Sequence, residues 1–530
     1  MVNCFCIERD AAHGLCGVRG KEAEKMKKTI RKCIGVLLIV ALLCGGGMTA
    51  SAGYIEDSTV FRASCTVNGD TATQRGFCWY TKTEVKTQIR VLENGRDVTE
   101  TLTLADEQCT AWEGNYMHKI TVKDLKSGTE YTYQLMGDAG WSEPGSFRTD
   151  DGDDKLSFIG IADVQASSLE NFMKGVRTVS AGLEMDPDAD FVVNLGDFTN
   201  DSTNEEWDYY AEAFDGFNSG VTLAPIAGNH DGLGVWHWFD NLFCLDTSES
   251  VQTLNGVNYS YDYGNAHFAV LNTNDALSLS LAQLKWLYND MRSTDKDWKI
   301  VFMHKSPYTL GKDGKWPDAL YTKETLARVC ELTGVDLVMS GHDHQYLRTK
   351  SLKLNRVVGD GEGVTYVLAG TAGSKRYEIR DFMLDHFITL DKLAALTVQK
   401  GGKDDTGFYH QCYLQDGSLD NVDLNRIGGV FNNITIEGGK LTYKAYVIKD
   451  REEGETEDVI TEIDSFELTK EPGENKIGYT GKNTTSAFEY ALLLIPSFLA
   501  LAVFTFGNWF PRFLCMLPKL VYTVITKDVF

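Results

Sequence analysis

Two stretches of sequence decide the fold: DFVVNLGD at residues 190–197 and VTLAPIAGNHD at residues 221–231. Each begins as a short apolar run, which indicates a buried strand, and each ends on polar side chains. In an open α/β sheet, the side chains that bind ligands gather at the carboxyl ends of the strands. The two stretches therefore predict an α/β domain with a functional site at one edge of its sheet.

The same pattern of an apolar run followed by a polar residue recurs elsewhere in the chain. KLSFIGIA runs into Asp163, WKIVFMH ends on His304, and VDLVMSG leads to His342. LAQLKWLYNDMR and TKETLARVCELTG flank the second of these runs and read as helices, so strands alternate with helices. YSYDYGNAHFAVLNT instead predicts two strands joined by a hairpin turn at Gly264. We therefore expect residues 151–470 to form an α/β domain with mixed sheets.

Residues 54–149 have a different pattern. They carry short runs with alternating apolar residues, namely GFCWYT, TQIRVLE, HKITVKDL and EYTYQLMG, separated by polar or glycine-containing turns. Short strands at regular spacing are typical of an all-β sandwich. We therefore expect a β-sandwich domain before the α/β domain.

The composition of the 530-residue chain is that of an ordinary globular protein, with 43% hydrophobic residues. Its formal net charge is -24. A chain this acidic repels the phosphates of nucleic acids, so we expect no nucleic-acid partner. The six cysteines between residues 53 and 480 form no C-x-x-C pair, so a zinc ribbon is not indicated, although disulfides remain open in an exported protein.

Both ends of the chain carry apolar segments that predict export and membrane attachment. Residues 26–52 read as a signal peptide, with basic residues, an apolar run and a final Ala-Ser-Ala, while residues 1–25 before it read as a non-native extension. A polar linker at residues 471–487 precedes an uncharged run at residues 490–510 that is long enough to span a bilayer. Basic residues in the tail, 511–530, place that tail in the cytoplasm.

These segments predict that both domains lie outside the cell and are held to the membrane by one C-terminal helix. The alternative for the first segment is an N-terminal anchor that is not cleaved. The alternative for the last is a buried core helix, which the polar linker before it makes less favourable.

Six polar residues at the ends of the predicted strands have the donor types of metal ligands. They are Asp163, Asp197, Asn229, His304, His342 and His344. Carboxylates, an amide oxygen and imidazoles together suit zinc, iron or manganese. A shared carboxylate can hold two such ions about 3.5–4 Å apart, where they polarise a phosphoryl group. Each residue alone could equally be a helix cap or a turn residue, but their joint placement predicts a site for two metal ions.

Five fragments of the sequence occur in the order found in one superfamily. They are Asp163-Val164-Gln165, Gly196-Asp197, Gly228-Asn229-His230-Asp231, His304 and Gly341-His342-Asp343-His344. In this order they resemble the calcineurin-like metallophosphoesterases. FMHKSPY, GHDHQYLRT and VTYVLAGTAGS are similar to purple acid phosphatases and their bacterial relatives. Residues 54–149 resemble the fibronectin type III-like N-terminal domain of those enzymes. The resemblance implies an αββα sandwich with mixed sheets after the all-β sandwich.

The resemblance also implies a role for each residue at the strand ends. Asp197 would bridge the two metals. Asp163 and His344 would bind the first metal, and the second would be bound by Asn229, His304 and His342. His230 would not be a ligand. It would act as general acid toward the leaving group or stabilise charge on the phosphoryl group. A metal-bound hydroxide would attack phosphorus in line.

Some residues depart from the family's pattern or have open roles. Gln165 stands where many members have histidine, and Asn200 stands where purple acid phosphatases have tyrosine. Without that tyrosine the purple colour should be absent, a ferric–divalent centre does not carry over from the resemblance, and the identity of the metals stays open among iron, zinc and manganese. The choice between binding metal and supporting the ligands is open for Gln165, Asn200, Tyr346 and Arg348. Trp236 and Trp238 either line a pocket for an organic leaving group or cover the core.

These expectations together predict a metal-dependent phosphoric ester hydrolase outside the cell, with a small phosphate monoester as substrate. A phosphodiesterase or nucleotidase on the same scaffold is the related alternative, because specificity lies in the loops around the metals. A second alternative is a surface adhesion protein that binds through the β-sandwich. The intact ligand set favours the enzyme, because a binding protein has no need to keep it.

Overall fold

The computed structural model describes residues 60–471 and 473, apart from residues 233–237, 252, 254–255, 276–278, 310–316, 354–355, 376–408, 413–426 and 450–457. Several predicted features lie outside the described residues: the extension at 1–25, the signal peptide at 26–52, nearly all of the linker at 471–487, the span at 490–510, the tail at 511–530, Trp236 and the side chain of Trp238. Among the described residues, no helix is long and apolar enough to cross a membrane.

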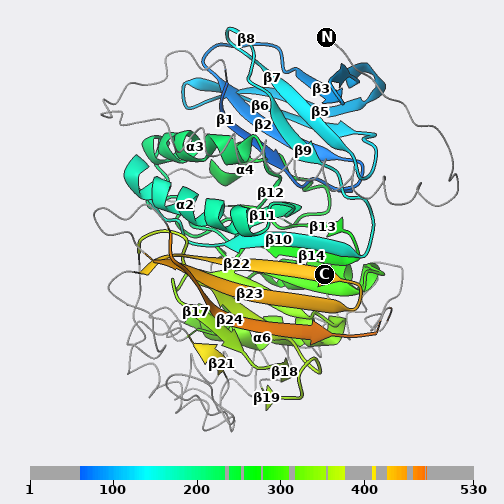
Figure 1. Ribbon diagram of the computed structural model, residues 1–530, viewed down its shortest axis with the longest axis vertical. Helices are drawn as coiled ribbons and strands as arrows, with labels where there is room; N and C mark the ends of the chain where they lie inside the picture. The colour runs from blue at the N-terminus through cyan, green and yellow to red at the C-terminus, as the bar shows by residue number, and fades with distance from the viewer. Residues whose placement is uncertain are drawn as a thin grey trace, which may run out of the picture. The chain divides into compact units, whose positions relative to one another are not determined.

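The N-terminal part is a β-sandwich, drawn in blue and cyan in Figure 1. One layer contains β1 (Phe61–Thr66), β2 (Arg75–Thr81), β6 (Asn115–Lys123) and β5 (Thr103–Trp112). The other contains β4 (Arg96–Asp97), β3 (Ile89–Glu93), β7 (Glu130–Gly137), β8 (Gly140–Trp141) and β9 (Gly145–Arg148), with a short 3-10 turn, η1 (Thr99–Thr101). Alternate apolar residues such as Trp79 and Tyr133 fill the core between the layers. The prediction of a β-sandwich is confirmed.

Two mixed sheets pack face to face in the second part. The first contains β10 (Lys155–Ile161), β11 (Phe191–Asn194), β12 (Leu223–Pro225), β22 (Ile427–Glu437), β23 (Lys440–Lys449) and β24 (Ile460–Thr469). The second contains β13 (Tyr259–Tyr263), β14 (Ala266–Leu271), β15 (Trp298–Lys305), β16 (Leu337–Gly341), β20 (Thr365–Ala369), β17 (Tyr346–Thr349) and β21 (Tyr409–Cys412), with a separate hairpin of β18 (Leu352–Lys353) and β19 (Arg356–Val357). Aromatic rings join the two sheets, because the Phe158 ring centroid lies 5.7 Å from that of Phe268 and 5.8 Å from that of Phe302.

Helices cover the outer face of each sheet. The first sheet is covered by α2 (Leu169–Met185), α3 (Asn204–Asn218) and α4 (Trp238–Leu242), and the second by α5 (Leu281–Ser293) and α6 (Pro317–Thr333). Phe172 of α2 packs in the same cluster as Ile159, and Leu287 of α5 packs in the same cluster as Val301. The layers are therefore helix, sheet, sheet and helix, which confirms the predicted αββα arrangement.

The two parts share one sheet and one core. β1 pairs in parallel with β12 at Thr66 and Leu223, so the first layer of the β-sandwich and the first α/β sheet form a single ten-stranded sheet. Tyr80 and Met117 of the β-sandwich lie in the same apolar cluster as Phe243. The sequence pattern predicts two separate domains and does not predict this continuous sheet. The continuity depends on a single residue pair between β1 and β12, which leaves no recognisable signal in the sequence.

The cysteines whose side chains the structure describes form no disulfide. Cys65, Cys78, Cys244 and Cys330 are buried and unpaired, and Cys109 is exposed on β5. Burial raises the pKa of the Cys65 and Cys78 thiols to about 12, so both remain uncharged. Apolar packing therefore holds the β-sandwich together.

Candidate metal centre

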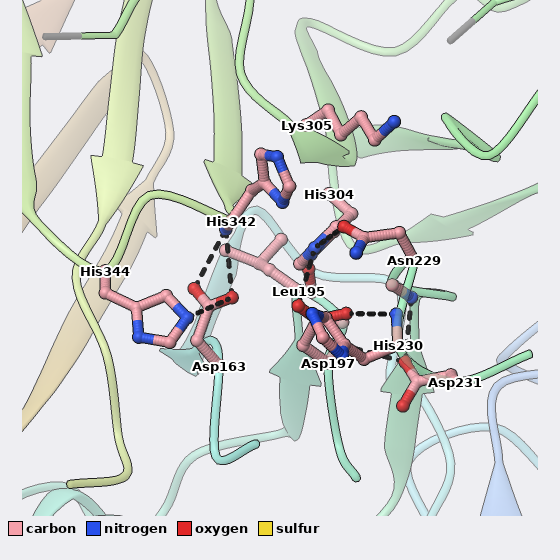
Figure 2. A network of polar contacts seen from close by, with 12 residues as sticks. Asp163, Leu195, Asp197, Asn229, His230, Asp231, His304, Lys305, His342 and His344 are labelled. Carbon is pink, nitrogen blue, oxygen red and sulfur yellow. Dashed lines mark hydrogen bonds and ion pairs between the residues drawn. The ribbon is translucent and has the colours of Figure 1, made fainter. Parts of the chain in front are cut away.

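Loops at the carboxyl ends of five strands meet at one centre (Figure 2). In the first sheet, β10, β11 and β12 are parallel and lead to Asp163, Asp197 and Asn229. In the second sheet, β15 and β16 are parallel; His304 lies near the end of β15, and His342 follows β16 directly. Because the carboxyl ends of parallel strands lie at the same edge, each sheet gathers its polar side chains there.

The loops that carry these residues have a strained backbone. Asp163, Asp197, His342 and His344 have φ values of 53°, 54°, 81° and 54°. This left-handed region costs a residue with a side chain about 1 to 3 kcal/mol, so it persists only where the surroundings hold it. One such contact is the backbone hydrogen bond from Asp163 to Gly196, at 3.0 Å. Other residues of the chain also have positive φ, but four such residues gathered at one place support a functional centre there.

The side chains form two groups that share Asp197. Single ligand atoms lie within 4.8 Å of one another in Asp197, His304 and His342, and likewise in Asp163, Asp197 and His344. His304 Nε2 lies 3.2 Å from Asp197 Oδ2, and His344 Nε2 lies 3.6 Å from Asp163 Oδ1. A carboxylate that belongs to both groups could be shared by two metal ions, and the bridging role of Asp197 stays a prediction.

Backbone carbonyls fix which nitrogen of two histidines faces the centre. His304 Nδ1 donates to the carbonyl oxygen of Leu195 at 2.8 Å, and His344 Nδ1 donates to that of Lys375 at 3.1 Å. A carbonyl only accepts, so each Nδ1 carries a hydrogen. The atom available to a metal is therefore Nε2, and His304 Nε2 also lies 3.2 Å from Asn229 Oδ1. Outward hydrogen bonds of this kind orient metal-binding histidines.

Burial perturbs the charges at the centre. It raises the pKa of Asp163 well above its usual range, and the neighbouring Asp197 carboxylate adds to this effect. Burial also holds the pKa of His342 well below its usual range, helped by the positive charges of His304 and Lys305. For His304, burial alone would lower the pKa, but the Asp197 carboxylate raises it to about 9. A bound cation would offset the cost of keeping these carboxylates charged in the interior.

Asp231, the last residue of the Gly228–Asp231 motif, holds two ligand loops together. Its buried carboxylate accepts four backbone hydrogen bonds: from Asp197 at 2.9 Å, Phe198 at 2.8 Å, Thr199 at 3.2 Å and Gly228 at 2.8 Å. The loops are so close that a Cβ on Gly228 would lie 2.1 Å from the Asp197 nitrogen. Sequence reasoning missed this role. One feature of the sequence could have indicated it: Asp231 lies inside a motif of predicted metal ligands but is not itself a predicted ligand.

His230 lies beside Asp197. Its backbone N–H donates to Asp197 Oδ1 at 2.8 Å, and its ring Nδ1 donates to the carbonyl oxygen of Asn200 at 2.5 Å. The side chain of Asn200 in turn accepts a hydrogen bond from the ammonium of Lys375. His230 belongs to neither group of ligand atoms found among the described residues. Its role in chemistry stays a prediction.

Comparison with known proteins identifies the two parts. The family model described as "Purple acid Phosphatase, N-terminal domain" matches residues 61–149, and the one described as "Calcineurin-like phosphoesterase" matches residues 156–346. Residues 156–346 belong to the calcineurin-like metallophosphoesterases. The second match includes the strands and loops of the candidate centre as far as Tyr346.

The relatives of this metallophosphoesterase are distant. "Purple acid phosphatase 15" of Arabidopsis thaliana is 27% identical over 180 residues, which are 32% of each chain. "Probable inactive purple acid phosphatase 1" of the same plant is 24% identical over 324 residues, or 52% of each chain. The chain thus spans about a third to a half of the length of these relatives. A purple acid phosphatase from yellow lupin (Lupinus luteus) seeds has the same fold, with a TM-score of 0.57, 16% identity and coverage of 83% of this chain and 81% of that one.

Two of the residues with open roles belong to a contact between sheets. Tyr346 donates to Asp464 at 2.8 Å, and Arg348 donates to both oxygens of the same carboxylate at 2.6 and 2.9 Å. All three side chains are largely buried. The contacts join β17 of the second sheet to β24 of the first, which gives both residues a packing role.

The surroundings of Gln165 bear on whether the metallophosphoesterase centre could bind metal ions. Its backbone N–H donates to the Asp197 carbonyl at 2.8 Å, which places it at the centre. Its side-chain oxygen is buried and has no hydrogen-bond partner among the described residues. A buried oxygen without a partner costs free energy, and a cation would satisfy it. The carboxylates and imidazoles of the two groups make a donor set that fits a pair of metal ions, and Gln165 lies on the same loop as Asp163; the identity of the metals stays open.

Proposed function

We propose that this metallophosphoesterase is an exported enzyme with two metal ions that hydrolyses phosphate monoesters, with His230 as its general acid. The observation that carries the proposal is the position of Asp197. Its carboxylate belongs to both groups of candidate ligand atoms, and it also accepts the backbone hydrogen bond of His230. Metal ions held there would polarise the phosphoryl group and supply an activated water.

The tautomer of His230 determines when it can donate a proton. Because Nδ1 donates to the Asn200 carbonyl, a neutral ring has no hydrogen on Nε2. Nε2 carries a proton only in the imidazolium form. Loss of that proton to the leaving oxygen returns the ring to the tautomer that Asn200 stabilises, so the same hydrogen bond holds the ring before and after transfer.

Activity itself needs a test, because one relative bears the name "Probable inactive purple acid phosphatase 1". The full chain is to be assayed for metal content and for hydrolysis of p-nitrophenyl phosphate and its bis-ester. We expect His230→Ala to keep the metals and to lose about 10²- to 10⁴-fold in kcat, the usual contribution of general acid catalysis. Asp188→Asn is the control, because Asp188 is exposed in the loop after α2 and belongs to neither group of candidate ligands.

The outcomes separate the candidate functions. Faster hydrolysis of the monoester supports the proposal, whereas faster hydrolysis of the bis-ester supports a phosphodiesterase. Turnover that survives in His230→Ala removes His230 from the chemistry. A chain that binds no metal overturns the proposal.

We further propose that the protein acts outside the cell and is held at the membrane by residues 490–510. The support is the sequence of the two ends, which lie outside the described residues. Protease added to intact cells is expected to remove the catalytic part. If removal requires broken cells, the proposed location is wrong.

A further inference from the structure

The loop that follows β20 brings a lysine to the metal centre. Thr371 Oγ1 donates to the carbonyl oxygen of Asp163 at 2.8 Å. A Cβ on Gly373 would lie 2.1 Å from the carbonyl oxygen of Val164, the residue after Asp163. The β20 loop and the Asp163 loop are therefore in close contact. The described part of the β20 loop ends at Lys375, whose carbonyl accepts the hydrogen bond of His344. The backbone of Lys375 is thus fixed relative to the candidate ligands.

The side chain of Lys375 extends toward the general acid. Its ammonium donates to Asn200 Oδ1, while the carbonyl oxygen of Asn200 accepts from His230 Nδ1. The amide nitrogen of Asn200 donates to Asp201 Oδ2 at 2.8 Å, which keeps the amide oxygen turned toward Lys375. One asparagine therefore holds both the general acid and a cation, and this cation is half-buried rather than sealed in the core.

We propose that Lys375 binds a non-ester oxygen of the substrate phosphate and so makes the centre selective for monoesters over diesters. This inference rests on the proposed function of the same centre. A phosphate monoester has three non-ester oxygens and up to two negative charges, whereas a diester has two such oxygens and one charge. An ammonium forms stronger hydrogen bonds to an anionic oxygen than to the neutral amide oxygen of Asn200. The additional anionic oxygen of a monoester gives Lys375 a better partner.

The competing explanation is that Lys375 only positions His230 through Asn200. The two explanations differ in what they predict for different substrates. A positioning residue would affect monoester and diester hydrolysis equally, because both need the same general acid. A residue that binds the phosphate would affect the monoester far more and would also change the affinity for inorganic phosphate.

The test uses the full metal-loaded chain with Lys375→Met, Lys375→Arg and the control Lys174→Met, which removes an exposed lysine of α2. It measures kcat/KM for p-nitrophenyl phosphate and its bis-ester, and inorganic phosphate binding by calorimetry. We expect Lys375→Met to lose about 10- to 100-fold in monoester kcat/KM and in phosphate affinity, the usual effect of one hydrogen bond to a charged group. Diester kcat/KM should change less than about threefold, and Lys375→Arg should restore most of the loss because it keeps the charge.

The measurements separate failure of this inference from failure of the proposed function. An equal loss for both esters, or none for either, overturns the role of Lys375 even if the wild type is an efficient monoesterase. A metal-loaded wild type that hydrolyses neither ester overturns the proposed function. Phosphate affinity then still decides the inference: a loss confined to Lys375→Met supports phosphate binding by Lys375, and an unchanged affinity excludes it.

Discussion

Asp231 connects two ligand loops through the four backbone hydrogen bonds that its carboxylate accepts. In Asp231→Asn, one carboxylate oxygen becomes an amide NH2 that would face backbone N–H donors. We expect this variant to lose about 2 to 4 kcal/mol in free energy of unfolding, because buried donors are left without acceptors. We also expect it to bind less metal, since the Asp197 loop is no longer held. Urea unfolding and metal analysis measure the two effects.

Asp188→Asn is the control for Asp231→Asn, because Asp188 is exposed and the same chemical change there should alter stability by less than about 0.5 kcal/mol. Wild-type stability together with a full complement of metal in Asp231→Asn would show that the ligand loops do not depend on this carboxylate.

Some individual residues at the centre can be found from sequence and others cannot. Asp163 and Asp197 each follow an apolar strand within a short motif, so local pattern and residue type are enough to select them. The contacts of Asp231, Asn200 and Lys375 depend on loops that are distant in the chain and meet only in the folded protein. Periodicity and motif spacing do not indicate contacts between residues that are distant in the sequence. Assignment of the metal ligands themselves stays a prediction until metals are measured.

At the scale of secondary-structure elements, His267 joins two strands to a helix. Its ring lies in β14, with Nδ1 2.6 Å from Asp262 of β13 and Nε2 2.8 Å from Asp290 of α5. Burial alone would lower the pKa of His267, but the two carboxylates, Asp290 foremost, raise it to about 10. The imidazolium therefore holds the three elements together at neutral pH.

The pKa of His267 predicts how stability changes with pH. The folded protein keeps this proton up to about pH 10, whereas the unfolded chain releases it near pH 6.5. The stabilisation is therefore complete below pH 6.5 and is lost as the pH rises toward 10. We expect His267→Gln to be less stable than wild type by about 2 to 4 kcal/mol at pH 6, and the difference to shrink by pH 10. Urea unfolding across this range measures it.

His118→Gln is the matched control for the pH series. Burial lowers the pKa of His118 to about 4, so its folded form is neutral throughout the range between pH 7 and 10. Its effect on stability should be independent of pH there. The same flat profile for His267→Gln would contradict the assignment of a charged His267.

The elements themselves are largely predictable, whereas their order in the sheets is not. The hairpin at residues 259–273 is confirmed as β13 and β14 with its turn at Gly264 and Asn265, because alternating apolar residues and a turn signal are local features. β10, however, pairs with β22 as well as with β11. Many apolar strands would fit that edge equally well by pattern, so the choice is made by packing of the whole core.

At the scale of the whole molecule, the β-sandwich completes the core of the phosphoesterase. Tyr80 and Met117 pack with Phe243, and Arg62 forms an ion pair with Asp208 of α3 at 2.8 Å. We expect a chain that lacks residues 60–149 to lose cooperative unfolding and metal binding, because its removal exposes this cluster and the edge of β12. Circular dichroism during heating and metal analysis test this expectation.

Arg62→Met is the comparison for that deletion. It removes the ion pair with Asp208 and the hydrogen bonds to Asn204 but keeps the apolar contacts, so its thermal unfolding should remain cooperative. A shortened chain that still unfolds in one sharp transition with bound metal would show that the phosphoesterase folds without the β-sandwich.

The position of β10 between β11 and β22 has a consequence for biosynthesis. Lys155 of β10 pairs with Glu437 of β22, so nearly three hundred residues must be translated before that edge is covered. At ordinary ribosome speeds this takes roughly 15 to 60 seconds, far longer than the collapse of a strand onto its neighbours. During that interval β10 can pair with wrong strands or other nascent chains. Slower synthesis at low temperature will not shorten the time during which this edge of β10 is uncovered. A chaperone that binds extended apolar segments should instead raise the yield of native protein.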